Sequence, residues 1–261
     1  MNTKIGAILL VSMVALSVAI PMVLGADPTT SATVNNAPAE YSCDATLTTP
    51  PGAGSDGTVS FTLVVTDLNG ADTISDSGWS AEWGGRTEVS LTKTGETATT
   101  KTFTESDDVP YTTTPGVKTV SFEAGETVVC TDDFTVEELT AYDIDFTAVA
   151  FGNVTINVEA TVSGDTNMGT PAAPTIENLG NKVMDVQISA SDMDGATDDI
   201  DNLNLGAKVG STAEQDLDAT RTFDANIAVA GTALIDYTLT AQPGTYPESK
   251  SGTTTVTGIA G

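Results

Sequence analysis

The sequence predicts an all-β protein with two antiparallel β-sandwich domains after an N-terminal signal peptide. Short runs rich in Val, Thr and Phe alternate with polar residues, and Gly, Pro and Asn turn signals separate these runs at regular spacing. No segment has the apolar periodicity of an amphipathic helix of four turns. Many short strands joined by regular turns are typical of antiparallel sandwiches. One continuous sandwich is the alternative arrangement.

The chain opens with the layout of a secretory signal peptide over residues 1–25. A long apolar run follows Lys4, and Val23 and Gly25 suit the −3 and −1 positions of a cleavage before Ala26. An uncleaved membrane anchor is the alternative, because the run is long enough to span a bilayer. Both arrangements place the rest of the chain outside the cytoplasm. We therefore expect an extracellular or cell-surface protein, with no membrane span once the signal is cleaved.

Residues 26–41 predict an extended N-terminal arm. They are small and polar and include proline, so they have little to bury by themselves. A sheet edge offers unpaired N–H and C=O groups, to which such a segment can add by main-chain pairing. Ala32 and Val34 would then fill shallow pockets, and the arm would mediate assembly. The alternative is a linker between the signal and the first domain.

The first predicted domain covers residues 42–140. Its expected strands carry β-branched and aromatic residues between Gly and Asn turn signals. Ala124-Gly125 predicts a tight hairpin between two of them. The expected strands are residues 58–66, 87–94, 98–105, 117–123, 126–131 and 133–137.

The second predicted domain covers residues 141–261, with the boundary near residues 138–143. Residues 192–204 form an acidic loop, and residues 203–217 hold at most one or two helical turns. The other segments alternate apolar and polar residues in the manner of half-buried strands. The expected strands are residues 144–151, 154–162, 183–190, 221–230, 232–240 and 252–260.

The composition argues against several classes of function. The chain has 36 acidic and 9 basic residues, a net charge of −27 and no His. Nucleic acids and anionic lipids need a basic surface, so we expect neither as a partner; solubility is the simplest alternative reason for the charge. No GxSxG, P-loop or dinucleotide-binding motif is present, and the usual general base is missing. Paired carboxylates can cleave glycosides without His, but the aromatic content of 5% is low for such a cleft. We therefore expect no enzyme and no catalytic residues.

Cys43 and Cys130 are the only cysteines in the chain. A lone pair in an exported protein most simply forms a disulfide, which here would close a loop of roughly 90 residues. Trp79 and Trp83 lie between them, an order also found in immunoglobulin domains. The alternative is that each Cys bridges to a neighbouring subunit.

Two acidic clusters predict bound Ca²⁺. Each places several carboxylate and amide oxygens close together in a glycine-containing turn, and calcium takes six to eight oxygen ligands. Neither cluster completes an EF-hand loop. Ordinary Asx turns with solvated acids are the alternative. The predicted ligands are Asp67, Asn69 and Asp72 in the first cluster, and Asp192, Asp194 and Asp198 in the second.

Asn153-Val154-Thr155 is a sequon for N-linked glycosylation. In an exported chain it predicts that Asn153 lies at the surface and accepts a glycan. A chance match of three residues is the alternative.

Several stretches resemble known surface proteins. Val34-Asn-Asn-Ala-Pro and residues 66–74 resemble the start of immunoglobulin-like repeats in archaeal surface proteins. Four stretches of the second half are similar to secreted β-sandwich proteins of methanogenic archaea and to fibre-forming sandwiches of the TasA and camelysin type; they are residues 164–171, 174–181, 183–192 and 237–246. The resemblance covers about half of the chain. It implies a structural role at the cell surface, in fibres where an arm completes the sheet of the next subunit.

From these observations we expect a structural subunit of an extracellular assembly, such as a filament, a sheath or an S-layer-associated structure. Its main partner would be a second copy of itself. The alternative is a monomeric surface adhesin or glycan-binding module, for which surface glycans would be the partner.

Overall fold

A computed structural model describes residues 36–261 of the chain. The signal peptide, and with it Ala32 and Val34 of the arm, lies outside the described residues. The described part is all-β, as the sequence predicts. Its strand pairings are all antiparallel, and its only helical elements are two 3₁₀ turns, η1 (Ala71–Thr73) and η2 (Asn202–Asn204). A search of residues 36–261 finds no helix with the length and hydropathy of a membrane span.

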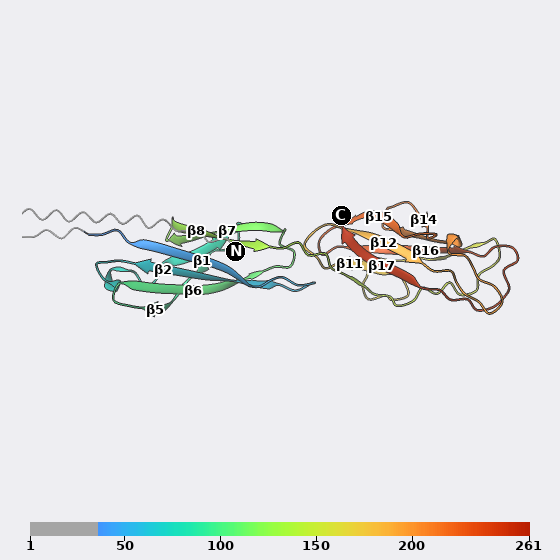
Figure 1. The fold of residues 1–261 in the computed structure, drawn as a ribbon, viewed down its shortest axis with the longest axis horizontal. Coiled ribbons are helices and arrows are strands. Elements are labelled where there is room, and N and C mark those ends of the chain that lie inside the picture. Colours follow the sequence, from blue (N-terminus) through green and yellow to red (C-terminus); the bar gives the residue numbers. More distant parts are fainter. Residues whose placement is uncertain (1–35) are drawn as a thin grey trace, which may run out of the picture. The chain divides into compact units, whose positions relative to one another are not determined.

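The first half of the described chain contains two four-stranded sheets (Figure 1). Their strand orders are β1-β2-β6-β5 and β4-β3-β7-β8. Figure 1 labels all strands of the first sheet, and β7 and β8 of the second. The strands are β1 (Glu40–Thr49), β2 (Gly57–Thr66), β3 (Trp79–Trp83), β4 (Val89–Ser90), β5 (Thr92–Glu96), β6 (Thr100–Val109), β7 (Gly116–Ala124) and β8 (Thr127–Val136).

These two sheets pack face to face because alternate residues of their strands are apolar. In β2 every second side chain, from Val59 to Val65, is almost fully buried, while the residues between them are partly exposed. Phe61 of β2 meets Phe122 of β7 edge to face, with ring centroids 6.2 Å apart. Since β2 and β7 belong to different sheets, this pair joins the two layers. The result is one apolar cluster between the sheets.

The second half contains a six-stranded and a three-stranded sheet. The larger has the order β14-β13-β16-β11-β9, with β10 also paired to β16, and the smaller has the order β15-β12-β17. The strands are β9 (Tyr142–Ile144), β10 (Glu159–Val162), β11 (Thr175–Asn178), β12 (Met184–Ala190), β13 (Leu205–Val209), β14 (Gln215–Asp216), β15 (Arg221–Ile227), β16 (Thr232–Thr240) and β17 (Thr254–Ala260).

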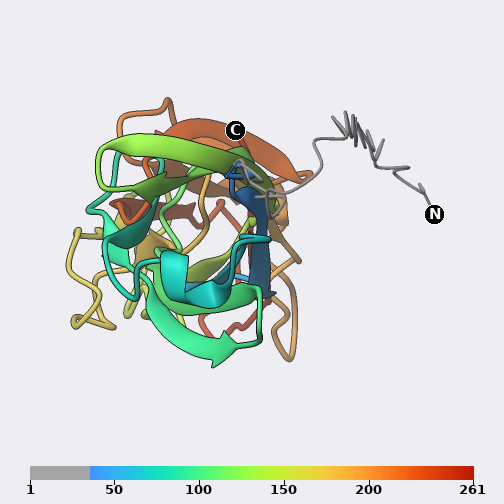
Figure 2. The ribbon, with the colours of Figure 1, turned by 90° about the vertical axis from the view of Figure 1, so that its left-hand side faces the viewer.

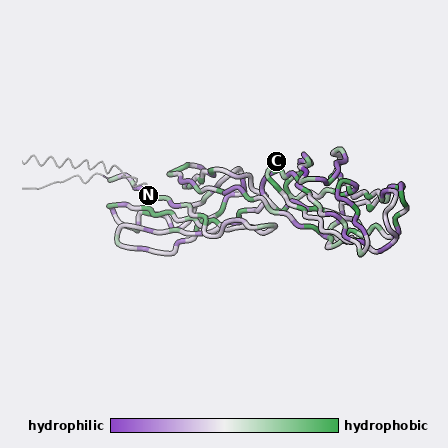
Figure 3. Tube along the Cα trace, turned by 45° about the vertical axis from the view of Figure 1, so that its right-hand side comes forward, coloured by the Kyte–Doolittle hydropathy of each residue, from purple (hydrophilic) through white to green (hydrophobic). Residues whose placement is uncertain are grey.

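A second, separate apolar cluster lies in this half. The alternation that predicts the strands is visible along the chain as successive hydrophobic and hydrophilic residues (Figure 3). In β16 it buries Ile235, Tyr237 and Leu239, and in β12 it buries Val186 and Ile188. The cluster therefore draws side chains from both sheets of this half.

Two strands expected in the second half are wrong over most of their length. The strand predicted over residues 144–151 ends at Ile144, where the Asp145 carboxylate accepts a hydrogen bond from Thr175 N (2.9 Å) and closes the ladder with β11. The strand predicted over residues 154–162 is present only as β10. Before it, Asn157 takes a left-handed conformation (φ 58°) and Val158 N bonds to Thr155 O (3.0 Å), so the chain turns there.

Other expected elements differ in extent. The strands predicted over residues 126–131 and 133–137 are one continuous strand, β8, and the one over residues 87–94 is divided between β4 and β5. Residues 203–217 were expected to hold at most one or two helical turns. The structure has one 3₁₀ turn there, η2, which is followed by β13 and β14. The expected hairpin between β7 and β8 is confirmed, with Gly125 in the left-handed region (φ 63°) at its turn. Five strands have no counterpart among the predicted ones, namely β1, β3, β11, β13 and β14, and β1 includes Glu40 and Tyr41, which were predicted to belong to the arm.

Candidate functional site

The predicted disulfide is present within the chain. Cys43 and Cys130 are bonded, with their Cα atoms 6.3 Å apart. Cys43 lies on β1 and Cys130 on β8, which are edge strands of different sheets. Close by, Ala45 N donates to the Asp132 carboxylate (2.9 Å), again from β1 to β8. The disulfide therefore ties the two sheets of the first half together along one edge.

The first acidic cluster forms a turn that satisfies its own carboxylate. Asp67 is buried, and its side chain accepts hydrogen bonds from Asn69 N (2.9 Å), Asn69 Nδ2 (2.7 Å) and Thr73 Oγ1 (2.7 Å). These bonds, the one from Asn69 N first, lower the pKa of Asp67. Asp72 lies on η1 (cyan in Figure 2) with its side chain exposed. The structure thus joins Asp67 to Asn69, while Asp72 points to solvent.

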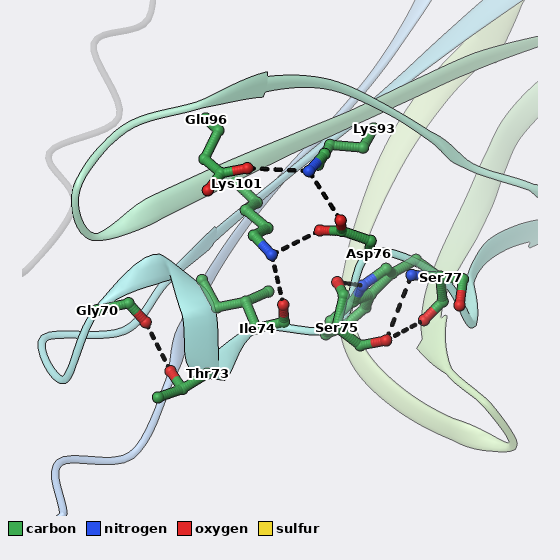
Figure 4. A network of polar contacts seen from close by, with 10 residues as sticks. Gly70, Thr73, Ile74, Ser75, Asp76, Ser77, Lys93, Glu96 and Lys101 are labelled. Atoms are coloured by element: carbon green, nitrogen blue, oxygen red, sulfur yellow. Dashed lines mark hydrogen bonds and ion pairs between the residues drawn. The ribbon is translucent and has the colours of Figure 1, made fainter.

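A buried ammonium group, which the sequence analysis missed, lies beside this turn (Figure 4). Lys101 is only 5% exposed, and its Nζ donates to Ile74 O (2.7 Å) and to the Asp76 carboxylate (2.5 Å). Lys93 Nζ donates to the other oxygen of Asp76 and to Glu96, both at 2.9 Å. The hydrogen bond from Lys101, followed by that from Lys93, lowers the pKa of Asp76. Lys101 stands at an inward-facing position of β6, and this is the signal that could have revealed it.

The second acidic cluster also holds a buried lysine. The Lys250 side chain is 4% exposed, and its Nζ donates to the main-chain carbonyl and carboxylate of Asp198 and to Glu248 Oε1 (3.0 Å). Glu248 also accepts from Thr197 N (2.9 Å) and Asp198 N (3.2 Å). These bonds, led by the one from Thr197 N, lower the pKa of Glu248 to about 2. Lys250 therefore neutralises Asp198, one of the predicted calcium ligands.

The other two predicted ligands of this cluster are exposed. Asp192 accepts a hydrogen bond from Asn202 N (2.8 Å), and the main chain of Asp194 pairs with Ser251. Within residues 36–261, no three His, Cys, Asp or Glu side chains are grouped as metal ligands. Calcium binding here stays a prediction.

One pair of carboxylates that the sequence analysis did not single out meets at Thr175. Asp145 accepts from Thr175 N (2.9 Å), and Asp165 accepts from Thr175 Oγ1 (2.9 Å). Asp165 also accepts from Asn167 N and Thr170 Oγ1, and these bonds, the one from Asn167 N first, lower its pKa. The second oxygen of Asp145 is buried without a hydrogen-bond partner in the described part of the chain. The two residues are twenty positions apart, so no local motif marks them.

Two adjoining cavities lie in the second half, with volumes of about 820 and 740 Å³. Phe151, Met193 and Lys250 line both of them. Asn153 of the predicted sequon is exposed and lines the larger cavity, together with Tyr246 and Glu248. The glycosylation site is thus predicted at the rim of a cavity.

The smaller cavity lies beside an open sheet edge. Thr254 and Val256 of β17 line it, with Ile144 and Phe146 on another side and Tyr237 of β16 among its walls. β17 is the last strand of its sheet. Ser191 N bonds to Thr253 O (2.9 Å) and Gly261 N to Val183 O (3.0 Å), which directs odd-numbered residues of this stretch toward the neighbouring strand.

By that register, the N–H and C=O groups of even-numbered residues in β17 face the open edge. The Tyr142 hydroxyl donates to one of them, Val256 O (3.0 Å). A Cβ at Gly258 would come within 2.7 Å of the Tyr142 ring and 2.5 Å of Met184 Sδ, so only glycine fits beneath this ring. Tyr142 therefore covers the far end of the edge, while the main chain around Thr254 faces the cavity.

Comparison with known proteins gives this chain no relative. No protein family and no curated protein matches the sequence. Among solved structures, the secreted serine protease VesC from Vibrio cholerae is similar over 83% of this chain and 50% of that chain, with 8% sequence identity and a TM-score of 0.22. The chain thus spans about half the length of that protein. A TM-score this low does not indicate a shared fold and carries no inference about activity.

Proposed function

We propose that the protein is a structural subunit of an extracellular cell-surface assembly, a filament, a sheath or an S-layer-associated structure, built from copies of itself. The observation that carries this proposal is the open edge of β17, where main-chain groups face a cavity and no strand of the described chain pairs with them. Such an edge is a template for pairing with another chain. Strand donation by the N-terminal arm is the mode of assembly we propose.

The rest of the structure is compatible with this role. The four sheets are open, so each ends in edge strands, and the disulfide between β1 and β8 is of the kind that persists in oxidising compartments outside the cytoplasm. The charge of −27 keeps free subunits apart at low salt. Assembly would therefore depend on specific pairing, and added salt should favour it by screening the repulsion.

The test is electron microscopy and light scattering of the mature protein, residues 26–261. We expect regular filaments or sheets from the intact protein. Deletion of residues 27–39, which ends before β1 begins, should leave the far-ultraviolet circular dichroism spectrum unchanged and abolish the polymers. Monomers from the intact protein at all salt concentrations would contradict the proposed function, whereas polymers from the deletion variant would contradict only the role of the arm.

A second candidate function, a glycan-binding module, draws support from the larger cavity. Its lining joins an aromatic side chain that is 56% exposed, Tyr246, to the polar groups of Thr245 and Glu248. Aromatic faces with a few polar groups suit the mixed surfaces of sugars. Binding of the monomer to a glycan array, lost on Tyr246→Ala, would favour this function.

A further inference from the structure

Residues Phe146–Val154 have the sequence of a strand but no strand partner. Apolar side chains recur along the segment, and Phe146 is buried while Val149, Phe151 and Val154 pack against the core. In the described chain, no main-chain hydrogen bond joins this segment to any other residue; the bonds resume only at Asn157 N, which donates to Ala241 O. We call Phe146–Val154 the strap. Side chains alone hold it in place.

The strap and the open edge of β17 line the same smaller cavity. Phe146, Val149 and Phe151 of the strap are among its lining residues, and so are Thr254 and Val256 of β17. A sequence that favours a strand thus lies near a strand edge without pairing to it. The strap thus covers part of the core beside a cavity of about 740 Å³, but in the described chain it makes no main-chain hydrogen bonds and does not complete the sheet.

A buried hydroxyl group near the strap also lacks a hydrogen-bond partner in the described chain. Tyr237 is fully buried, and its hydroxyl has no hydrogen-bond partner in the described part of the chain. The Phe146 ring packs against it edge to face, with centroids 6.2 Å apart. Burial raises the pKa of Tyr237, so the hydroxyl stays protonated and remains a donor. A buried donor without a partner is unfavourable, and an arriving hydrogen-bond acceptor would recover that cost.

We propose that the strap is a removable cover, and that its departure opens β17 to the N-terminal arm, residues 26–39, of a second copy of this chain. This inference rests on the proposed function and deepens it, because it names the acceptor strand and adds a step that regulates assembly. In the free subunit the strap shields the core beside β17. In the assembly the arm pairs with the main chain of Thr254 and with the N–H of Val256, whose C=O already accepts from the Tyr142 hydroxyl, and the strap is displaced outward.

Two properties of the arm fit this acceptor. Residues 26–35 can span about 33 Å when extended, whereas the stretch Ser251–Val256 beside the cavity spans about 20 Å. The arm can therefore cover the edge while Ala37 and Ala39 stay in contact with their own subunit. The arm is also rich in Thr, Ser and Asn, whose side chains can accept a hydrogen bond from the Tyr237 hydroxyl once Phe146 has moved away. An apolar strand would pair with the edge but leave that donor unsatisfied.

The experiment measures binding of a synthetic peptide of residues 26–39 to the mature protein that lacks residues 27–39, by isothermal titration and by hydrogen exchange. We expect the amides of Thr254 and Val256 to become protected when the peptide binds. Thr254→Pro removes the outward N–H and should weaken binding about tenfold, the effect of one main-chain hydrogen bond. Thr254→Ala is the matched control, because it trims the side chain but keeps the N–H, and it should bind as the parent protein does.

A second variant tests the cover. Phe151→Ala removes an anchor of the strap, raises the population of the open state and should speed peptide binding roughly tenfold. If Phe151→Ala leaves the rate unchanged, the strap is not a cover. If the peptide binds but Thr254→Pro and Thr254→Ala behave alike, with no protection of β17, the acceptor edge lies elsewhere and the proposed assembly function still stands. If the peptide does not bind while the intact protein polymerises, the arm is not the occupant.

Discussion

The two halves of the described chain use the same strand chemistry but close their cores differently. The first half has four strands of ten residues, β1, β2, β6 and β8, and a disulfide joins two edge strands across the sandwich. The second half has shorter strands, and part of its core is covered by the strap, which makes no main-chain hydrogen bonds to other residues. The cavities and the unpartnered Tyr237 hydroxyl also lie in the second half. From this difference we expect the first half to be the more stable one, and the binding that we propose is located in the second.

Each half also has a buried lysine in or beside an acidic cluster that was predicted to bind calcium. Lys101 pairs with Asp76, whose side chain is 59% exposed, while Lys250 pairs with Asp198 and Glu248, which are 34% and 14% exposed. The first lysine, Lys101, bonds to Ile74 O and Asp76, neither of which is a predicted ligand. The second lysine pairs with one predicted ligand, Asp198. The predicted ligands of the two clusters therefore differ, because only the second cluster has one that is paired with a lysine.

The largest expected effect comes from removing the disulfide. Replacing both cysteines with Ser should destabilise the first half by about 4–5 kcal/mol in the chain-entropy treatment, because the bridge closes a loop with a sequence separation of 87. Trp79 and Trp83, the two Trp of the chain, both lie in the first apolar cluster, so tryptophan fluorescence reports on this half alone. Urea unfolding followed by fluorescence should show the loss.

Hydrogen exchange of β12 and β16 is the control for this prediction. These strands belong to the second cluster, and their protection should stay unchanged in the variant without the disulfide. Equal loss of protection in both halves would show that the halves unfold together, and the assignment of stability to the first half would then fail.

A pair of phenylalanine substitutions tests the difference between a packed core and the strap. Phe122 is fully buried between the sheets of the first half, so Phe122→Ala should cost about 3–5 kcal/mol. Phe151 is only partly buried on the strap, so Phe151→Ala should cost less than about 1.5 kcal/mol. Thermal melts of the two variants give the comparison. Equal losses would mean that the strap is as firmly packed as the core.

Strands are predicted well from the sequence where apolar and polar residues alternate and turn residues mark both ends. The predicted strand over residues 232–240 matches β16, because alternation and flanking turns fix its ends. The disulfide was equally predictable, because the chain has no other cysteine that could pair with either residue. The strap was misjudged because its alternation is that of a strand, and pairing depends on whether a neighbour is available. The strap has no such neighbour, because the Asp145 side chain accepts the hydrogen bond from Thr175 N and the pairing between β9 and β11 ends there.

The polar site residues were harder to predict for a similar reason. Lys101 is 25 positions from Asp76 and Lys250 is 52 positions from Asp198, so no local motif reports these two pairings, although Glu248 is close to Lys250 in the sequence. Asp145 and Asp165 meet only through Thr175. A cluster of acidic residues can be recognised in a sequence, but the lysine that pairs with it can come from a distant part of the chain.

A smaller effect is expected from acid. The pKa of Glu248 lies at about 2 in the folded protein, below its usual value of 4.5, so the ionised form stabilises the loop at neutral pH. This contribution is present above pH 4.5 and is lost as the pH falls toward 2. The protection of the Thr197 and Asp198 amides, measured against the intrinsic exchange rate at each pH, should therefore decrease over this range. Glu248→Gln should show faster exchange at neutral pH and little further change in acid. A wild-type profile that stays flat from pH 5 to about 2 would contradict the role of Glu248.

The smallest expected effect is that of calcium. Extracellular calcium modules bind with dissociation constants of roughly 0.1–1 mM, so millimolar calcium should stabilise the protein by about 1 kcal/mol, and chelation should lower the melting temperature accordingly. Asp67 already accepts three hydrogen bonds within its turn and Asp198 is paired with Lys250, so a bound ion must rely on the exposed Asp72, Asp192 and Asp194.

Site-directed variants distinguish the two clusters. Asp72→Asn should remove the calcium response of the first half, read by tryptophan fluorescence, and Asp192→Asn that of the second, read by hydrogen exchange of β12. Asp108→Asn, an exposed acid on β6 outside both clusters, is the matched control for the change of charge. Since screening is not specific for one divalent ion, an equal response to magnesium, or an equal loss in the control, would assign the stabilisation to the net charge of −27 and not to shaped sites.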